Sequence, residues 1–366
     1  MKVLFLGGCG EMAAAMLPLL RDDDVIESIT LADISGERAR AVAAQWGPRF
    51  RGIEVDASWH DQLVGAMAGH ECVVNYIGPF YRFEKPCAAA AIEAGVPYVS
   101  IADDYDAFLN VWELEDAARA ANVKILSGFG NSPGLTQILA KLGYLAMDTP
   151  REIRVNWGAG SNEQVGPANI LHVMHLMTGK TPQWRDGRRA WVQTGDGKKL
   201  VNFPEPVGEI PVFYTGHAES VTLPMFLPGL RYVSLHGGTN PAWIFPFVSF
   251  LSQLGITKTH ARRSATLRFM SPFLPLFSGS NDPNKSVGRV EVTGTHQGQP
   301  AERTYTYVGH IAHITSVPCY LAVRSVLKGE FDDKPGGVYA PERIVDDPSA
   351  LVEKARALGI EIHTVE

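Results

Sequence analysis

Three small residues near the start of the chain have the spacing of a loop that binds a dinucleotide. They are Gly8, Gly10 and Ala13, and they follow the apolar run VLFL (3–6). In such a loop the first glycine permits a tight turn and the second lets the backbone approach a pyrophosphate. The third small residue lets a helix pack closely on the strand. We therefore expect a nucleotide here, with its phosphates at the start of a helix that continues to about Leu20.

An acidic residue at the end of the next apolar run, SITLAD (28–33), bears on which dinucleotide would bind. A carboxylate at the position of Asp33 accepts hydrogen bonds from the ribose hydroxyls and repels a 2′-phosphate, which favours NAD over NADP. Ser35, Arg38 and Arg40 follow closely and are able to accommodate a phosphate. NADP therefore stays open as the alternative.

Further cofactor contacts are expected where later apolar runs end. Asp56 ends the third run, where it would approach the adenine or cap the next helix. Gly78-Pro79 forms a rigid turn expected beside the nicotinamide ribose, and Ser132-Pro133-Gly134 forms a second loop between a strand and a helix. The residues predicted to contact the cofactor are Gly8, Gly10, Glu11, Met12, Asp33, Ser35, Asp56, Ala57, Asn75, Ile77, Gly78, Pro79 and Pro133.

Hydride transfer also needs groups that bind the substrate and move a proton. Tyr81 would bond a substrate amine or simply lie at an exposed helix start. One of Asp103 and Asp104 would bind an ammonium group while the other caps a helix. His172 is a candidate for proton transfer because imidazole titrates near neutral pH. It lies three residues from His175, but the chain contains no metal-binding motif such as HExxH, so we expect no metal.

The elements that position these residues alternate between strands and helices in the first 145 residues. Six apolar runs of strand length are each followed by a helical stretch, which predicts a doubly wound parallel sheet over residues 1–135. From residue 136 to residue 312 the runs alternate like antiparallel strands, and the last two indicate a hairpin. This region is expected to be an α+β domain that binds substrate and forms oligomers. Residues 313–366 are expected to return to the first domain.

The composition is that of a globular protein. The chain has 366 residues, a net charge of −6 and no block of basic residues, which argues against a nucleic-acid partner. Its four cysteines form no CxxC pair; we expect Cys9, Cys72 and Cys319 to be core residues, and the protein to reside in a reducing cytoplasm. The most apolar segment, PAWIFPFVSFLSQLG (241–255), is too short to span a bilayer; we expect a buried or lid helix, with a membrane-surface contact as the alternative.

Six segments, spread over nearly the whole chain, resemble segments of one enzyme family. They are VLFLGGCGEMA (3–13), VVNYIGPF (73–80), AAIEAGVPYVSIADD (90–104), GFGNSPGLTQILA (128–140), FPEPVGEIPVFYTGHAESVTLP (203–224) and GGVYAPE (336–342). On these segments the chain is similar to the saccharopine dehydrogenase-like oxidoreductases, and most closely to the lysine 6-dehydrogenase branch. The resemblance implies a Rossmann domain interrupted by an α+β domain, and a homodimer or tetramer.

The resemblance also implies the chemistry: NAD(P)-dependent hydride transfer at a C–N bond of an amino acid or amine. It places the loop with His217 and Glu219 towards the substrate pocket, so His217 is a further candidate for substrate contact or proton transfer. The second domain is rich in aromatic residues, among them Trp157 and Phe245. They would form core, or they would bind an apolar substrate whose C=C or C=O bond is reduced. A nucleotide sensor without catalysis is the third hypothesis.

Overall fold

The computed structural model describes residues 1–160, 163, 166–272 and 284–365. The chain forms two compact units, each assembled from two stretches of sequence. The first unit comprises Met1–Leu135 and Thr315–Asp346, and the second comprises Thr136–Ile314 and Asp347–Glu366. Each unit is built around its own sheet.

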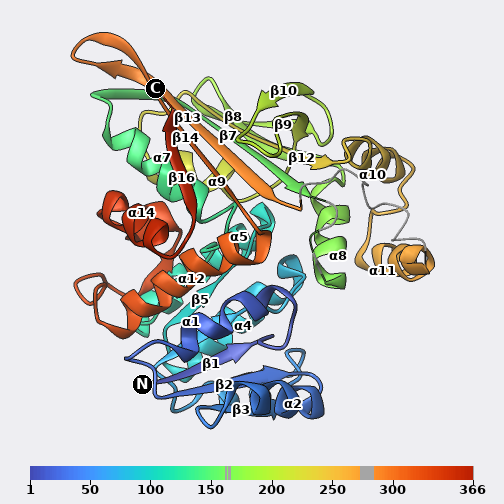
Figure 1. The fold of residues 1–366 in the computed structure, drawn as a ribbon, viewed down its shortest axis with the longest axis vertical. Helices are drawn as coiled ribbons and strands as arrows, with labels where there is room; N and C mark the ends of the chain where they lie inside the picture. The colour runs from blue at the N-terminus through green and yellow to red at the C-terminus, as the bar shows by residue number, and fades with distance from the viewer. Residues whose placement is uncertain (161–162, 164–165, 273–283, 366) are drawn as a thin grey trace. The chain divides into compact units, whose positions relative to one another are not determined.

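The first unit contains a seven-stranded sheet with the order β15-β6-β5-β4-β1-β2-β3 (Figure 1). Its described strand pairs are all parallel, so the predicted doubly wound sheet is confirmed. The chain builds outward from β1 in one direction and then from β4 in the other, and ligands bind beside such a switch point. The strands are β1 (Lys2–Leu6), β2 (Ser28–Asp33), β3 (Phe50–Glu54), β4 (Cys72–Asn75), β5 (Tyr98–Ser100), β6 (Lys124–Leu126) and β15 (Gly337–Tyr339).

The central strands of this sheet are mostly apolar and buried because helices cover both faces, whereas the edge strand β3 carries the exposed Arg51 and Glu54. In β1, for example, residues 3–6 are fully buried. The helices are η1 (Met12–Ala15), α1 (Leu17–Arg21), α2 (Gly36–Trp46), α3 (His60–Met67), α4 (Phe80–Ala94), α5 (Tyr105–Trp112), α6 (Glu115–Ala120), α13 (Pro341–Ile344) and most of α12 (Ile311–Leu327).

Strand β15 adds a seventh strand to the six that the sequence predicts, and an ion pair anchors it. Arg343 donates to the two carboxylate oxygens of Glu115 at 3.0 and 2.8 Å, and the backbone N–H of Val338 donates to the same carboxylate at 2.6 Å. Burial raises the pKa of Glu115, but these hydrogen bonds and that from Arg119 outweigh it and bring the pKa to about 2.

The second unit contains a nine-stranded, mostly antiparallel sheet, as predicted. Its main path is β10-β11-β12-β7-β13-β14-β16, while β8 pairs with β12 and β9 pairs with β8. Among the described pairs of this sheet, β12 and β7 are parallel and the others antiparallel. The strands are β7 (Thr149–Gly160), β8 (Lys180–Arg185), β9 (Arg188–Gln193), β10 (Lys199–Asn202), β11 (Glu209–Tyr214), β12 (Tyr232–Asn240), β13 (Ser286–His296), β14 (Gln299–Gly309) and β16 (Glu361–Val365).

Two hairpins in this sheet have two-residue turns with left-handed backbone. The predicted hairpin of β13 and β14 turns at Gln297 and Gly298, where φ is +51° and +72°. The hairpin of β8 and β9 was not predicted, although its turn is the Asp186-Gly187 pair that favours this conformation. The sequence therefore carried a usable signal for the second hairpin as well.

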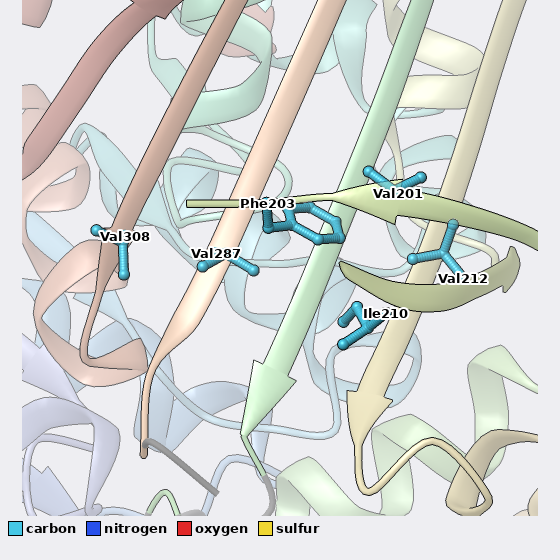
Figure 2. Packing of buried hydrophobic residues seen from close by; sticks show 6 residues of the cluster. All are labelled: Val201, Phe203, Ile210, Val212, Val287 and Val308. Atoms are coloured by element: carbon cyan, nitrogen blue, oxygen red, sulfur yellow. The ribbon is translucent and has the colours of Figure 1, made fainter. Parts of the chain in front are cut away.

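A buried apolar cluster closes one face of the sheet. It contains Val201, Phe203, Ile210, Val212, Val287 and Val308 (Figure 2). Figure 2 shows the chain around β10 crossing the long strands, which brings Val201 and Phe203 into one cluster with Val287 of β13 and Val308 of β14. Gly158 permits this close packing, because a Cβ atom there would lie 2.7 Å from Cδ1 of Ile210. Each buried side chain of this size contributes about 1.5–3 kcal/mol to stability.

The end of the chain differs from our expectation. Residues 315–346 belong to the first unit, but the last helix and strand belong to the second. The physical reason is strand pairing: β16 pairs with β14 and covers a strand that would otherwise lie at the sheet edge. The helices of the second unit are α7 (Leu135–Leu145), α8 (Pro167–Leu176), α9 (Glu219–Phe226), α10 (Ile244–Gln253), α11 (His260–Met270) and α14 (Pro348–Ala357).

The four cysteines are free and buried, which agrees with the interpretation of Cys9, Cys72 and Cys319 as core residues. Burial raises the pKa of each thiol, and a protonated thiol is unreactive. Within the described ranges, no helix has both the length and the apolar character needed to cross a membrane.

Candidate functional site

The glycine loop leaves the carboxyl end of β1 and turns at Gly7. Gly7 has a φ of +71°, and its N–H donates to the carbonyl of Ala32 in the neighbouring strand at 2.9 Å. A Cβ atom at Gly7 would lie 2.9 Å from the carbonyl carbon of Tyr76. Because the left-handed residue is Gly7, the assignment of the tight turn to Gly8 is wrong by one position.

Gly8 and Gly10 serve close packing and ligand access. A Cβ atom at Gly8 would lie 2.9 Å from Leu31 and 3.0 Å from Phe5, so this glycine lets the loop pack on the sheet. At Gly10, the one described atom within 4 Å of an added Cβ is the carbonyl oxygen of Gly7, at 3.3 Å. The outer side of Gly10 is thus open for a phosphate to approach the backbone.

The helix after this loop is shorter than expected. A 3-10 turn, η1, contains Met12, and a separate short helix, α1, begins at Leu17. Pro18 lies in the first turn of α1, where its missing N–H is tolerated, and so a new helix starts there. Ala13 is fully buried and its N–H donates to the carbonyl of Gly10 at 3.1 Å, as expected of the third small residue.

Asp33 and Arg38 lie next to each other beside the glycine loop. Asp33 accepts a hydrogen bond from the N–H of Ser35 at 3.0 Å, and the Ser35 hydroxyl caps α2 by accepting from the N–H of Arg38 at 3.2 Å. Arg38 donates to the carbonyl of Cys9 at 2.6 Å. Burial and the charge of Asp33 raise the pKa of Cys9 to about 11, while Arg38 opposes the shift. The acid predicted to bind the ribose is therefore at the loop.

Asp56 stabilises a turn and does not cap α3. Its carboxylate accepts hydrogen bonds from the N–H and the hydroxyl of Ser58, at 2.9 and 2.5 Å, and these hydrogen bonds lower its pKa. Helix α3 begins after Trp59, whose side chain makes no cap hydrogen bond. Ala57, predicted beside the adenine, is buried in this turn.

The Asn75–Pro79 loop leaves the carboxyl end of β4. The side chain of Asn75 is fully buried, and its Oδ1 accepts from the N–H of Ile77 at 2.9 Å. The N–H of Tyr76 donates to the carbonyl of Leu6 at 2.9 Å. The Gly78–Pro79 peptide is cis and leads into α4. The side chain of Asn75 thus fixes the shape of the loop that we predicted to flank the nicotinamide.

A buried carboxylate that the sequence analysis missed holds these strand ends together. Glu84 is fully buried in α4, and it accepts hydrogen bonds from Asn75 at 3.2 Å, Tyr98 at 2.7 Å and Ser127 at 2.8 Å. Ser100 donates to it as well. Burial raises the pKa of Glu84, although the four donors oppose the shift. The available signal was the position of Glu84 on the buried face of α4, four residues from Phe80.

Tyr81 and Asp104 are joined at the start of α4. Asp104 is buried and accepts a hydrogen bond from the backbone N–H of Tyr81 at 3.2 Å. It precedes α5, but its side chain makes no cap hydrogen bond to that helix. The structure therefore contradicts a cap role for Asp104. Asp103 is half-buried. Arg82, which follows Tyr81 in α4, is exposed.

The loop around Ser132 and Pro133 closes on itself through glycine. Gly134 has a φ of +126°, and a Cβ atom there would lie 2.0 Å from the carbonyl oxygen of Gly130. The N–H of Gly130 donates to the carbonyl of Pro133 at 3.1 Å, and the Ser132–Pro133 peptide is cis. This tight loop follows β6, and so it lies at the same carboxyl edge of the sheet as the other predicted loops.

In the second unit, two predicted histidines meet. Nε2 of His172 in α8 lies 3.1 Å from Nε2 of His217, which precedes α9, and both side chains are buried. A hydrogen bond between the two nitrogens requires that one ring donates and the other accepts, so the two tautomers are coupled. The ring of Trp157 stacks on His217 with centroids 5.2 Å apart and planes 7° apart, and Phe245 contacts Trp157 edge-on.

Glu219 and Tyr307 are two further buried polar residues of the second unit. Glu219, in the first turn of α9, is fully buried and accepts a hydrogen bond from Thr136 at 2.7 Å. Burial and the charge of Glu219 raise the pKa of Tyr307 well above its ordinary value. The aromatic residues of this unit divide: Trp157, Phe203, Phe213 and Phe245 are buried, whereas Trp191 and Trp243 are exposed.

Comparisons with known proteins agree with the first unit's geometry. Residues 3–126 match the family model described as the saccharopine dehydrogenase NADP binding domain. The predicted NAD(P) cofactor class is therefore confirmed, and the matched segment contains the glycine loop, Asp33 and the Asn75–Pro79 loop.

Two solved structures share the fold over the whole chain. Saccharopine dehydrogenase (L-Glu forming) from Saccharomyces cerevisiae is 18% identical, with all of both chains covered and a TM-score of 0.69. Homospermidine synthase from Legionella pneumophila, solved with NAD, is 13% identical over all of this chain and 91% of that chain, with a TM-score of 0.63. The chain is thus an NAD(P)-dependent oxidoreductase that contains a saccharopine dehydrogenase-type NADP binding domain and has the saccharopine dehydrogenase fold.

Proposed function

We propose that the chain transfers a hydride between NAD(P) and a C–N bond of an amino acid or amine. The observation that carries the proposal is the set of loops at one sheet edge: the glycine loop after β1, Asp33 ending β2, Asn75–Pro79 after β4 and Ser132–Gly134 after β6. A dinucleotide binds along such an edge of a parallel sheet. The names of the two structural relatives, saccharopine dehydrogenase and homospermidine synthase, refer to secondary amines and support the C–N assignment.

The residues present fit a dinucleotide, with NAD preferred. The open side of Gly10 would receive the pyrophosphate, and Asp33 would accept hydrogen bonds from the ribose hydroxyls. The negative charge of Asp33 would repel a 2′-phosphate. Arg38, which would otherwise bind that phosphate, donates a hydrogen bond to the carbonyl of Cys9. Glu11, Met12, Ser35, Ala57, Ile77 and Pro133 complete the proposed contact set.

When amine is oxidised, the substrate carbon gives up a hydride and the nitrogen gives up a proton. We assign the proton to the His172–His217 pair, because adjacent imidazoles at 3.1 Å can pass a proton between them. Asp103 would attract the substrate ammonium, Asp104 would fix the start of α4, and Tyr81 would bond the amine. The lysine 6-dehydrogenase activity suggested by the sequence is the first member of this class to test.

A second candidate is the reduction of an apolar C=C or C=O bond. The observation that favours it is the aromatic surround of His217, where Trp157 stacks on the ring and Phe245 packs behind Trp157. An apolar substrate would gain from burial against such rings. In that case His217 would donate a proton to carbon or oxygen instead of nitrogen.

One assay distinguishes the candidates. Nicotinamide absorbance is followed with NAD and with NADP against lysine, other diamino acids, aldehyde–amine pairs that form imines, ketones and enones. Turnover with lysine or another amine, faster with NAD, supports the proposal. Turnover with ketones or enones alone would replace it by the second candidate.

A further inference from the structure

Helices α10 and α11 of the second unit expose large apolar side chains. Phe250 and Leu254 of the α10 segment are 56% and 60% exposed, and Phe269 of α11 is 76% exposed. Single exposed apolar residues are ordinary on a protein surface, but a concentration of them marks an interaction site. The proton-transfer pair and the cofactor loops make no use of these three residues, so their exposure calls for another explanation.

Apolar residues of α10 and of its two cap positions form a stripe along one side of the helix; Phe247 is half-buried and the others are exposed. Trp243, Phe247, Phe250 and Leu254 follow each other at intervals of four, three and four residues, which places them on one face. Residues on the other side, including Phe245 and Val248, are buried in the unit. The helix is therefore apolar on both faces, and the unit itself covers one of them. The outer face is suited to a second apolar environment.

The sequence that carries this stripe contains cations and no acids. Residues 220–281 contain no aspartate or glutamate, although the whole chain has 39 acidic residues. The same range contains Lys258 and Arg268, both exposed, together with three further arginines. At neutral pH the surface formed by α10 and α11 is thus apolar and cationic.

The cationic and apolar groups share one surface. A shallow hollow is lined by Leu254 and Ile256 from the end of the α10 segment and by Arg262 from α11. Arg262 donates to the carbonyl of Gly255 at 2.8 Å, which ties the two segments together. On α11, Arg262 and Phe269 are seven residues apart and share a helix face. Figure 1 shows the two helices as neighbours in the stretch that follows β12.

We propose that α10 and α11 form a peripheral docking surface for an anionic lipid membrane. Aromatic and aliphatic side chains would enter the boundary between headgroups and acyl chains, while the exposed side chains of Lys258, Arg262 and Arg268 would pair with lipid phosphates. A second copy of the chain fits this surface less well. Two copies meeting through the same patch would bring its cations together with no acidic residue of 220–281 to neutralise them.

Flotation of the full-length protein with vesicles tests the proposal. Vesicles of phosphatidylcholine with phosphatidylglycerol are compared with vesicles of phosphatidylcholine alone. We expect binding to the anionic vesicles and loss of most of it when salt is raised to about 0.5 M, because the Debye length shortens. The double variant Phe250→Asp, Leu254→Asp should weaken binding by about tenfold or more, since it removes apolar burial and adds negative charge.

Matched variants separate this surface from general effects. Leu200→Asp replaces an equally exposed apolar residue on β10, and it should bind vesicles like the native protein. Lys258→Glu with Arg268→Glu should reduce binding, whereas Arg188→Glu with Arg189→Glu, the same change at the exposed β8–β9 turn, should not.

Three results would overturn the proposal. The first is the absence of anionic vesicle binding by the native protein. The second is equal binding by Phe250→Asp, Leu254→Asp and by Leu200→Asp. The third is a native protein that ignores vesicles but becomes smaller in solution when Phe250 and Leu254 are changed, because the surface would then be an interface between copies.

Discussion

The parallel sheet of the first unit and the mixed sheet of the second place chemical groups by different means. In the first unit, backbone loops at the strand ends position these groups, and glycines at positions 7, 8 and 134 permit the loop shapes. In the second unit, His172 and His217 are 45 residues apart in the sequence and are held by ring packing against Trp157. The first kind of site can be recognised from the local spacing of residues in the sequence, whereas the second depends on tertiary packing.

The largest expected effect comes from the packing-dependent pair. His217→Gln should lower kcat by about a hundredfold or more, the usual contribution of a general acid–base. It should leave the cofactor Kd unchanged, since the cofactor loops belong to the first unit. Steady-state kinetics over a pH series and cofactor titration measure both, with the exposed His363→Gln as the control. A variant that loses cofactor binding and keeps its pH profile would contradict the proton role.

Gly10→Val makes the converse change in the loop-dependent site. It should raise the Kd for the dinucleotide by about a hundredfold, because the side chain would occupy the path of the pyrophosphate. Thermal unfolding should remain near that of the native protein, since the described surroundings of Gly10 are open. Gly65→Ala, in an open part of α3, is the control. If the folded Gly10→Val variant bound the dinucleotide with native affinity, the glycine loop would not be part of the cofactor site.

Glu84→Gln tests whether side-chain packing also supports the loop-dependent site. An amide in place of the carboxylate would face donors from Tyr98, Ser100 and Ser127, and the loss of stability should be about 2 kcal/mol. Urea unfolding measures it. Glu93→Gln, at an exposed position of the same helix, should cost less than about 0.5 kcal/mol. Equal stability of both variants would show that the buried network is dispensable.

The second sheet has its own pH dependence through His236. Burial lowers the pKa of this histidine from 6.5 to about 3, and Lys199 and Arg185 add to the shift. The stabilising contribution of the neutral ring is present above pH 6.5 and is lost as the pH falls towards 3. Relative to His236→Gln, the native protein should lose about 1.4 kcal/mol for each pH unit in this window. Urea unfolding of both proteins at several pH values measures this difference. If the histidine were exposed, the free energies of unfolding of the two proteins would change with pH in parallel.

The fold was predictable because its signals are local. Alternation of apolar runs and helices indicates the parallel sheet, and the Gly8-x-Gly10-x-x-Ala13 spacing locates the cofactor loop, although the positive φ lies at Gly7. Glu84 was not predicted, because a single acid within a helical pattern is ordinarily exposed. Its four hydrogen-bond donors lie outside its helix, 9 to 43 residues away in the sequence. No local sequence pattern predicts the contact between His172 and His217, because the two residues are 45 positions apart. The pairing of β16 with β14 likewise depends on a sheet edge that forms only in the folded unit.

Transfer of deuterium tests the central claim most directly. Each candidate amine is labelled at the carbon that bears nitrogen and incubated with the protein and oxidised NAD or NADP. If the chain acts at a C–N bond, mass spectrometry will find the deuterium in the reduced cofactor, together with release of the corresponding carbonyl compound. Reduced cofactor that is consumed by ketones or enones, with no label accepted from any amine, would contradict the claim.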